Sequence, residues 1–202
     1  MTLHSFPDWE ALYKNEGVEH LPWYSPSLDP DLEAALTRHG IRSGRVLDQG
    51  TGPGTQAIAL AKRGFDVTAT DVSLAAIAYA SRKAEAERVQ PAFVQDDILA
   101  TRLTGPFDVV FDRGCFHILS ADQRPAYVQA MQRLLGAAGW LFLKTFSHLQ
   151  PGDIGPYRFS PDQIRALFSE ATGFEVRETL DTVFQGQLDP FPRALFSAIR
   201  RR

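Results

Sequence analysis

The sequence predicts an α/β fold, a seven-stranded, doubly wound, Rossmann-like sheet with helices on both faces. From about residue 45 onward, strand-like and helix-like segments alternate, which is typical of parallel strands joined by crossover helices. The last two strand-like segments, 174–184 and 193–200, leave no room for a helix between them. Because a parallel pair needs a crossover, we expect these two strands to form an antiparallel pair.

Two strand–helix units begin the alternation. The segment 45–48 is a short apolar run that ends near glycines, and the segment 55–63 carries apolar residues at helical spacing before Gly64. The segment 65–70 is typical of a second strand, and the alanine-rich segment 74–88 is typical of the helix that follows it.

The rest of the sheet is predicted from short apolar runs near Gly and Pro, at 91–95, 107–111 and 139–146. Ser120 and Ser160 each stand three residues before a Gln, which is the spacing of a capping box, so each is expected to begin a helix. Residues 147–157 contain two Pro and two Gly without periodicity and are expected to form a loop.

Length and composition indicate a single globular domain. The 202 residues are 44% hydrophobic and 22% charged. A chain of this size buries roughly 70% of the surface that it exposes when unfolded, so it needs no disulfide or metal to form a core. We expect one domain over 1–202, with a helical, aromatic-rich, lid-like segment over 1–40 covering the site and an α/β core over 41–202.

Charge, cysteine content and apolar runs restrict the setting and the partners. A net charge of −3 provides no broad positive field, so a small molecule is expected as partner and nucleic acid is not. No apolar run approaches the roughly 20 residues that cross a bilayer, and no basic leader precedes an apolar stretch, so no membrane partner is expected. With Cys115 as the only cysteine, a reducing, cytoplasmic setting is the simplest inference. We expect a monomer or a homodimer.

Polar residues follow each of the first four predicted strands. In an open α/β sheet, the ligand crevice lies beyond the carboxyl ends of the strands, so these residues are candidates for a site. They are, in strand order, Asp48 with the turn Gln49-Gly50-Thr51-Gly52-Pro53-Gly54, then Asp71, then Asp96 and Asp97, and then Asp112 and Arg113.

The glycine turn differs from that of dinucleotide-binding domains, where G-x-G-x-x-G seats a pyrophosphate on helix-terminal amides. Here the spacing is G-x-G-x-G from Gly50, Thr55 occupies the place of the third dinucleotide glycine, and Pro53 removes an N–H donor. The nearby Asp48 carboxylate suits a ligand with an ammonium or sulfonium group better than one with two phosphates.

Two later acids suit other parts of a nucleoside. Asp71 lies 21 residues after Gly50, where its carboxylate can accept two hydrogen bonds from a ribose diol. The alternative is that Asp71 only caps the helix that follows. Asp97 can accept a hydrogen bond from the exocyclic amine of adenine, although adjacent acids after a strand are also common in solvated turns.

The segment Val46 to Asp71, VLDQGTGPGTQAIALAKRGFDVTATD, resembles the first two motifs of class I S-adenosylmethionine-dependent methyltransferases. An acid, three glycines and a distal acid fall in order on strand, turn, helix and strand. The resemblance implies S-adenosyl-L-methionine as cofactor, with Gly50 and Gly52 beside its methionine part, Asp71 on the ribose hydroxyls, and Asp97 with Ile98 around the adenine. Asp96 stands where many relatives have a small residue, which leaves open which of the two acids contacts the base. The expected cofactor contacts are Asp48, Gly50, Thr51, Gly52, Asp71, Val72, Asp97, Ile98 and Asp112.

A closer resemblance is to the thiopurine, thiol and halide methyltransferases and the tellurite-resistance-like enzymes. It rests on residues 9–13, on Leu21-Pro22-Trp23, and on FDRGCF at 111–116 followed by DQRPAY at 122–127. Together with the cofactor motifs, it covers about residues 9–146. It implies that the aromatic N-terminal segment folds over the site and that Arg113 lies near the methyl acceptor.

Methyl transfer from a sulfonium is an in-line displacement, so the protein mainly has to position donor and acceptor. Opposite charges vanish in the transition state if the acceptor is a thiolate, so an aromatic site closed to water assists the reaction, and Arg113 can favour ionisation of the thiol. We predict that Trp9, Tyr13, Trp23, Arg113 and Phe116 bind the acceptor, with Tyr24 as a further aromatic wall, and that Asp112, Arg113 and His117 are catalytic.

These residues also have structural explanations. The N-terminal aromatics can simply cover the sheet edge, and Arg113 can form an ion pair with its neighbour Asp112. Cys115 and His117 are too few for a zinc site, so no metal is expected. His117 is either a packing residue or a proton acceptor.

The sequence therefore predicts an S-adenosylmethionine-dependent methyltransferase of a small molecule, with a thiol or similar soft nucleophile as the expected acceptor. The alternative acceptor is an oxygen or nitrogen of a small metabolite. A macromolecule methyltransferase is disfavoured by the acidic charge balance and by the absence of an evident recognition domain. A non-catalytic adenosylmethionine-binding protein, or an NAD-type oxidoreductase on a similar sheet, is the remaining alternative.

Overall fold

The computed structural model describes residue 4, residues 6–15 and residues 17–202, and these residues alternate between strands and helices. The strands are β1 (Arg45–Gln49), β2 (Asp66–Asp71), β3 (Ala92–Gln95), β4 (Phe107–Arg113), β5 (Leu135–Ser147), β6 (Arg158–Phe159), β7 (Phe174–Val183) and β8 (Arg193–Arg201). The α-helices are α1 (Trp9–Asn15), α2 (Pro30–Arg38), α3 (Thr55–Lys62), α4 (Leu74–Ala86), α5 (Arg124–Leu134) and α6 (Pro161–Leu167).

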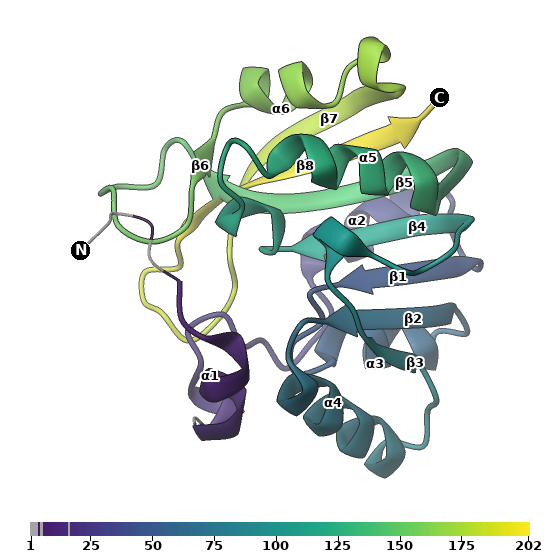
Figure 1. Cartoon of the computed structure of the whole chain (residues 1–202), viewed down its shortest axis with the longest axis vertical. Coiled ribbons are helices and arrows are strands. Elements are labelled where there is room, and N and C mark those ends of the chain that lie inside the picture. The colour runs from purple at the N-terminus through teal and green to yellow at the C-terminus, as the bar shows by residue number, and fades with distance from the viewer. Residues whose placement is uncertain (1–3, 5, 16) are drawn as a thin grey trace.

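Across the described residues, the strands form one eight-stranded sheet in the order β3-β2-β1-β4-β5-β8-β7, with β6 paired to β5 outside this path. Strands β1 to β5 run parallel, and β8 is antiparallel to both β5 and β7 (Figure 1). The predicted doubly wound sheet and its C-terminal antiparallel pair are confirmed. The two-residue strand β6 was not predicted, because it is too short to leave a pattern in the sequence.

Helices cover both faces of the sheet and enclose two hydrophobic cores. Tyr127 and Met131 of α5 belong to the core on one face, and Leu32 of α2 belongs to the core on the other. Successive residues of β4 alternate between the two, with Val109 in the α2 core and Val110 in the α5 core. This period of two is what a strand buried on both faces requires.

The helix starts follow the predicted capping chemistry, with one shift. Ser160 forms a capping box, because its hydroxyl accepts from the N–H of Gln163 and its own N–H donates to the Gln163 side chain. The N–H of Ser120 likewise donates to Oε1 of Gln123, at 3.0 Å. Helix α5 nevertheless begins only at Arg124, because the residues between form a separate turn.

The order of the strands creates a crevice at one edge of the sheet. The chain runs from β1 outward to β2 and β3, and then returns to place β4 on the other side of β1. Loops that leave β1 and β4 therefore diverge, and a ligand can enter between them. Helix α1 and the loop between β7 and β8 lie beyond this edge, where β1 and β2 end (Figure 1).

A buried ion cluster attaches the segment before α2 to the sheet. Nζ of Lys144, in β5, lies 2.8 Å from Oδ2 of Asp29 and 2.6 Å from Oδ2 of Asp31. Nε of Arg113, at the end of β4, donates to Oδ2 of Asp29 at 2.8 Å. The side chains of Lys144 and Asp29 are fully buried. Burial by itself raises the pKa of Asp29, but the two cations lower it overall, so the carboxyl group is ionised.

The same cations contact two further segments. Arg113 donates to the carbonyl oxygens of Trp23, at 3.0 Å, and of Gln185, and Lys144 donates to the Gln185 side chain at 3.1 Å. The cluster thus joins the N-terminal segment, β4, β5 and the β7–β8 loop. The expected alternative, an ion pair between Arg113 and its neighbour Asp112, is wrong, because the partner of Arg113 is Asp29, 84 residues earlier in the chain.

Lys144→Met is expected to destabilise the protein by about 3–5 kcal/mol, because it leaves a buried carboxylate without one of its two cations. Guanidinium denaturation at pH 7 measures the loss. Lys62→Met is the matched control, because Lys62 forms an exposed ion pair with Glu87, and it should cost less than about 1 kcal/mol. A Lys144→Met protein as stable as the control would show that the cluster does not hold the segments together.

Candidate active site

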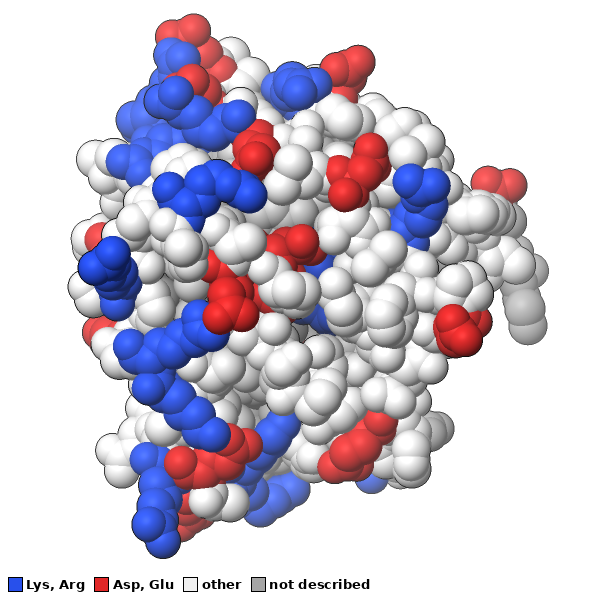
Figure 2. Space-filling view, turned by 180° about the vertical axis from the view of Figure 1, so that it is seen from behind, with Lys and Arg blue, Asp and Glu red and all other residues white. Residues whose placement is uncertain are grey.

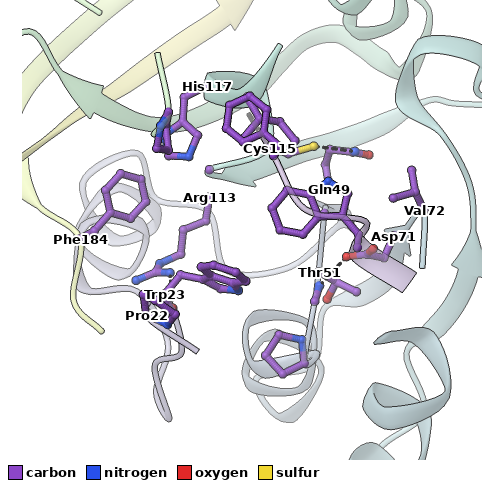
Figure 3. A pocket seen from close by; sticks show the side chains of 18 of the residues that line it. Pro22, Trp23, Gln49, Thr51, Asp71, Val72, Arg113, Cys115, His117 and Phe184 are labelled. Carbon is purple, nitrogen blue, oxygen red and sulfur yellow. Dashed lines mark hydrogen bonds between the residues drawn. The ribbon is translucent and has the colours of Figure 1, made fainter. Parts of the chain in front are cut away.

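A cavity of about 500 Å³ opens at the carboxyl ends of β1, β2 and β4, where the sequence predicts the ligand crevice. Figure 3 shows two groups of side chains facing each other across it, with Cys115 between them. One group, called here the glycine-loop half, comprises Asp48, Gln49, Gly50, Thr51, Gly52, Asp71, Val72, Asp97 and Ile98. The other, the aromatic half, comprises Phe6, Trp9, Trp23, Arg113, Gly114, His117, Phe146, Phe184 and Leu188.

Asp71 is the last residue of β2 and belongs to the glycine-loop half of the cavity. Its Oδ2 accepts from the N–H of Gly52, at 2.9 Å, and its Oδ1 accepts from the N–H of Ser73, at 3.0 Å. Each carboxylate oxygen keeps a second lone pair, and the residue lines the cavity. The cap of α4 is supplied by Ser73, whose hydroxyl accepts from the N–H of Ala76. Asp71 therefore orders the glycine turn and remains able to accept from a ligand diol.

Two donors contact the same oxygen of the Asp48 carboxyl group. The hydroxyl of Thr51 and the N–H of Ala57 both donate to Oδ2, the second at 3.1 Å. Burial raises the pKa of Asp48 to about 6, although these donors oppose the shift. The carboxylate lies under the turn and lines the cavity, where a cationic ligand group would favour its charged form.

The glycine turn brings its backbone close to other groups. Gly50 and Gly52 have φ values of +67° and +50°, which an L side chain rarely adopts. A Cβ atom on Gly52 would lie 2.6 Å from the hydroxyl oxygen of Tyr13. Tyr13, predicted to bind the acceptor, lines the cavity with its hydroxyl group over the glycine turn. Its hydroxyl accepts from Nε1 of Trp23 at 3.3 Å, and burial raises its pKa, so it stays protonated.

The two acids after β3 have different surroundings. Asp97 is exposed and lines the cavity, and its Oδ1 accepts from the N–H of Leu99. Asp96 is buried and points elsewhere, where its Oδ1 accepts from the N–H of Arg102. Asp97, and not Asp96, is the acid available to a nucleobase in the cavity.

Helix α1 is attached to this half by Glu10, a residue that the sequence reasoning missed. Oε2 of Glu10 accepts from the hydroxyl of Ser73, at 2.7 Å, and from the N–H of Ala75, at 3.0 Å. A carboxylate at the first turn of α4 is a favourable partner for the free N–H groups there. No local pattern identifies such a contact, because the two residues that meet are 63 positions apart.

Two of the aromatic residues that the sequence predicts as walls line the aromatic half. Trp9 and Trp23 line it and meet edge to face, with ring centroids 5.8 Å apart. The expectation for Tyr24 and Phe116 is wrong. The ring of Tyr24 lies outside the cavity lining, 5.5 Å from the ammonium group of Lys83. Phe116 is fully buried in the α5 core.

Residues from later in the chain complete these walls. Phe146 at the end of β5, and Phe184 and Leu188 of the β7–β8 loop, face the cavity and were not predicted. Their chain positions gave no signal of it, because an apolar residue at a strand end is typical of ordinary core.

The prediction that Asp112 is a catalytic and cofactor-binding residue is also wrong. It is fully buried and absent from the cavity lining. Its carboxyl group accepts from the hydroxyl of Tyr127, at 2.8 Å, and from the N–H groups of Cys115 and Phe116. Burial raises its pKa to about 6. Asp112 thus holds the turn after β4 by accepting hydrogen bonds from its backbone.

Arg113 and His117 both line the cavity, but neither has the predicted chemistry. The guanidinium group of Arg113 is engaged by Asp29 and two carbonyl oxygens, so its charge is already balanced. Nδ1 of His117 accepts from the N–H of Phe146 at 3.0 Å. Burial, and to a smaller degree Arg113, lower the pKa of His117 to about 3. His117 is therefore neutral, and with so low a pKa it is too weak a base for the expected role of proton acceptor.

Over residue 4, residues 6–15 and residues 17–202, no three His, Cys, Asp or Glu side chains are grouped to hold a metal ion. Cys115 accepts a weak hydrogen bond from Nε2 of Gln49, at 3.5 Å, and burial raises the pKa of its thiol. It therefore stays protonated and packs beside Gly50.

Comparisons with known proteins agree with this fold and site. Residues 46–139 match the family model described as a methyltransferase domain. The chain is 30% identical over 171 residues to 2-heptyl-1-hydroxyquinolin-4(1H)-one methyltransferase of Mycobacteroides abscessus, covering 80% of this chain and 74% of that one. It is 30% identical to thiocyanate methyltransferase 1 of Arabidopsis thaliana, covering 66% and 58%.

A solved structure is similar over nearly the whole chain. It comes from work on the conversion of a disulfide bond into a thioacetal group during echinomycin biosynthesis. The TM-score is 0.82 at 26% identity, with coverage of 96% of this chain and 91% of the other. The fold, the glycine turn and these relatives define a methyltransferase. The chain belongs to the class I S-adenosylmethionine-dependent methyltransferases, which excludes the NAD-type oxidoreductase alternative.

The glycine-loop half fits S-adenosylmethionine. The cofactor has a cationic methionine part, a ribose diol and an adenine ring. The open side of the Asp48 carboxyl group suits the cationic part, and the free lone pairs of Asp71 suit the diol. Asp97 with Val72 and Ile98 provides one polar and two apolar neighbours for the base. These assignments of individual residues stay predictions.

Asp71→Ala is expected to weaken binding of S-adenosylhomocysteine by about 1–3 kcal/mol, because the ribose loses its acceptors. Isothermal titration calorimetry measures the change. Asp66→Ala is the matched control, because it removes an exposed aspartate from the other end of β2 and should leave the affinity unchanged. Equal affinity of the two variants would refute the assignment of Asp71.

The pKa of His117 predicts a pH dependence of stability. The folded pKa of about 3 lies below the ordinary value of 6.5, so the unfolded chain binds the proton more readily. Stability is therefore fully present above pH 6.5 and falls as the pH drops toward 3, at up to about 1.4 kcal/mol per pH unit.

His117→Asn should remove this component, so its stability should fall by about 2 kcal/mol less than that of the wild type between pH 7 and pH 5. Chemical denaturation at each pH provides the two values. Between pH 7 and pH 8.5 the two proteins should run parallel. If the wild type and His117→Asn lose the same stability between pH 7 and pH 5, His117 is solvated in the folded protein.

Proposed function

We propose that the chain methylates a small molecule that carries a thiol or a similar soft nucleophile. The observation that carries this proposal is the aromatic half of the cavity, which adjoins the glycine-loop half and is lined mostly by apolar side chains, several of them from the N-terminal segment. When bound, S-adenosylmethionine supplies the electrophilic methyl group. The side chains of the chain itself orient the acceptor and exclude water.

Apolar walls favour this reaction for an electrostatic reason. A thiolate and a sulfonium lose their charges as the methyl group moves, so the transition state is less polar than the reactants. Trp9, Trp23 and Phe184 replace water around these charges and so favour the less polar state. The aromatic faces also attract a sulfonium, by roughly 0.5–2 kcal/mol.

Similarity to thiocyanate methyltransferase 1 supports a soft nucleophile and membership of the thiol, halide and tellurite-resistance-like branch. Similarity to a hydroxyquinolone methyltransferase supports the second candidate, O-methylation of a small heteroaromatic molecule. In both cases the named acceptor is small, and so is the acceptor that we propose for this chain.

The outer surface supports a small acceptor over a nucleic acid. Figure 2 shows Lys and Arg interleaved with Asp and Glu on the face that it displays. Arg38 pairs with Glu178, Lys62 with Glu87 and Arg63 with Glu33, so these cations offer little free charge to a phosphate backbone. No helix in the described ranges is both long enough and apolar enough to cross a bilayer.

A product assay with radiolabelled S-adenosylmethionine tests the proposal. The acceptor panel contains aliphatic and aromatic thiols, a selenol, iodide, thiocyanate, phenols, a 1-hydroxyquinolin-4-one, amines and a lysine peptide. We expect the highest kcat/KM with a thiol. A strong preference for the hydroxyquinolone would replace S-methylation by O-methylation, and transfer to the lysine peptide alone would refute a small-molecule acceptor.

A further inference from the structure

His117 is held in a single tautomer by the backbone. Nδ1 lies 3.0 Å from the N–H of Phe146, which can only donate, so Nδ1 must be the unprotonated nitrogen. The proton of the neutral ring is therefore on Nε2. A second proton on Nδ1 would face another donor, so charging the ring would break this hydrogen bond.

Nε2 is directed toward the cavity past a glycine. A Cβ atom on Gly114 would lie 3.1 Å from Nε2 and 3.7 Å from the ring of Phe184, so the missing side chain leaves this space open. Both Gly114 and His117 line the cavity. Among the described residues, Nε2 has no hydrogen-bond acceptor, whereas Nδ1 has its donor. Nε2 is not among the buried polar atoms that lack a partner, so it is accessible, and a ligand acceptor atom in the cavity can bind it.

Among the described residues, the charged group that acts on His117 is Arg113 of β4, which is itself paired with Asp29. Phe146 of β5 and Phe184 of the β7–β8 loop supply the rings packed at 5.0 and 5.4 Å. The loop before β6 contributes only a backbone contact, from the N–H of Tyr157 to the carbonyl oxygen of His117. Because Asp29 pairs with Arg113, the site at Nε2 carries little net charge and is otherwise apolar.

No described group in the aromatic half can remove a proton from an acceptor. Arg113 is a permanent cation, Nδ1 of His117 accepts from the N–H of Phe146, and Nε2 already carries the ring proton. Cys115 and Tyr13 are held protonated by burial. The carboxylates that line the cavity, Asp48, Asp71 and Asp97, belong to the glycine-loop half and already accept backbone hydrogen bonds.

We propose that Nε2–H of His117 binds the nucleophilic atom of an acceptor that is already an anion when it enters, and that this acceptor is an aromatic thiolate. The proposal rests on the proposed function and deepens it. The ring of the acceptor lies among the aromatic walls, and its sulfur accepts from Nε2.

The group transfer requires no proton acceptor on the protein. The thiolate sulfur forms the new bond to the methyl carbon, the bond from that carbon to the sulfonium sulfur breaks, and its electron pair stays on the departing sulfur. The thiol proton has already passed to solvent. Thiols that ionise near neutral pH are therefore the substrates that this site can use.

Two amide variants separate the two ring nitrogens. His117→Asn places an amide oxygen near Nδ1, so it can still accept from Phe146 but has no donor near Nε2. His117→Gln places an amide N–H near Nε2. A hydrogen bond to a charged group contributes enough to change binding about 10- to 100-fold. His117→Asn should lower kcat/KM for an aromatic thiol by that factor, and His117→Gln should lower it by about fivefold or less.

The state of the bound thiol gives a readout independent of turnover. Thiophenols absorb differently as thiol and thiolate, so thiophenol itself, which ionises near neutral pH, can be titrated while bound to the protein with S-adenosylhomocysteine. We expect its pKa to be lowered on the wild type and to rise by one to two pH units on His117→Asn. His148→Asn, an exposed histidine after β5, is the control and should match the wild type.

The dependence of rate on pH completes the test. With saturating cofactor, the pH at which kcat/KM reaches its plateau should move with the solution pKa of each thiol. A limb at one fixed pH for all thiols would reveal a base on the enzyme and overturn the proposal. Equal bound pKa values on wild type and His117→Asn would overturn it as well, and equal losses in the Asn and Gln variants would assign His117 a scaffold role.

Failure of the proposed function has a different outcome. If the wild type transfers no methyl group to any thiol but methylates the hydroxyquinolone, S-methylation is refuted. The His117 pair then reports on an oxygen anion in the same assay. If the wild type methylates thiols and the His117 variants behave like it, S-methylation stands and the donor role is refuted.

Discussion

Two cations and two carboxylates meet where the N-terminal segment joins the sheet, with Lys144 and Asp29 fully buried, and the shape of the aromatic half depends on their pairing. Lys144 and Arg113 lie on neighbouring strands, and both require a carboxylate because an unpaired charge in the interior is very costly. Asp29 can satisfy both only if the segment before α2 lies against the strand ends. The same contacts bring in Trp23 and the β7–β8 loop, which supply walls of the cavity.

The aspartates at the ends of the strands have different roles. Asp71 holds the glycine turn and remains open to a ligand, whereas Asp112 uses its oxygens on Tyr127 and on the turn after β4. Burial raises the pKa of both Asp48 and Asp112 to about 6. Only Asp48 of these two lines the cavity, so only its charge can respond to a bound cation.

On the function that we propose, methyl transfer needs no acid–base catalysis at the acceptor. Among the described residues, the carboxylates that line the cavity belong to the glycine-loop half, where the cationic cofactor part is expected. The aromatic half offers one neutral N–H donor and rings from three segments of the chain. Selection among acceptors is then expected to depend on their ionisation and shape.

The alternation of elements, the glycine turn and the placement of Asp71 follow from the sequence alone, because each is a local or periodic pattern. The tertiary structure decided the rest. Asp29 and Lys144 are 115 residues apart, so their pairing leaves no local signal. Phe116 and His117 are adjacent, yet one enters the α5 core and the other faces the cavity. Which of two neighbours turns inward is set by the packing around them, because a tight turn offers no period to predict it.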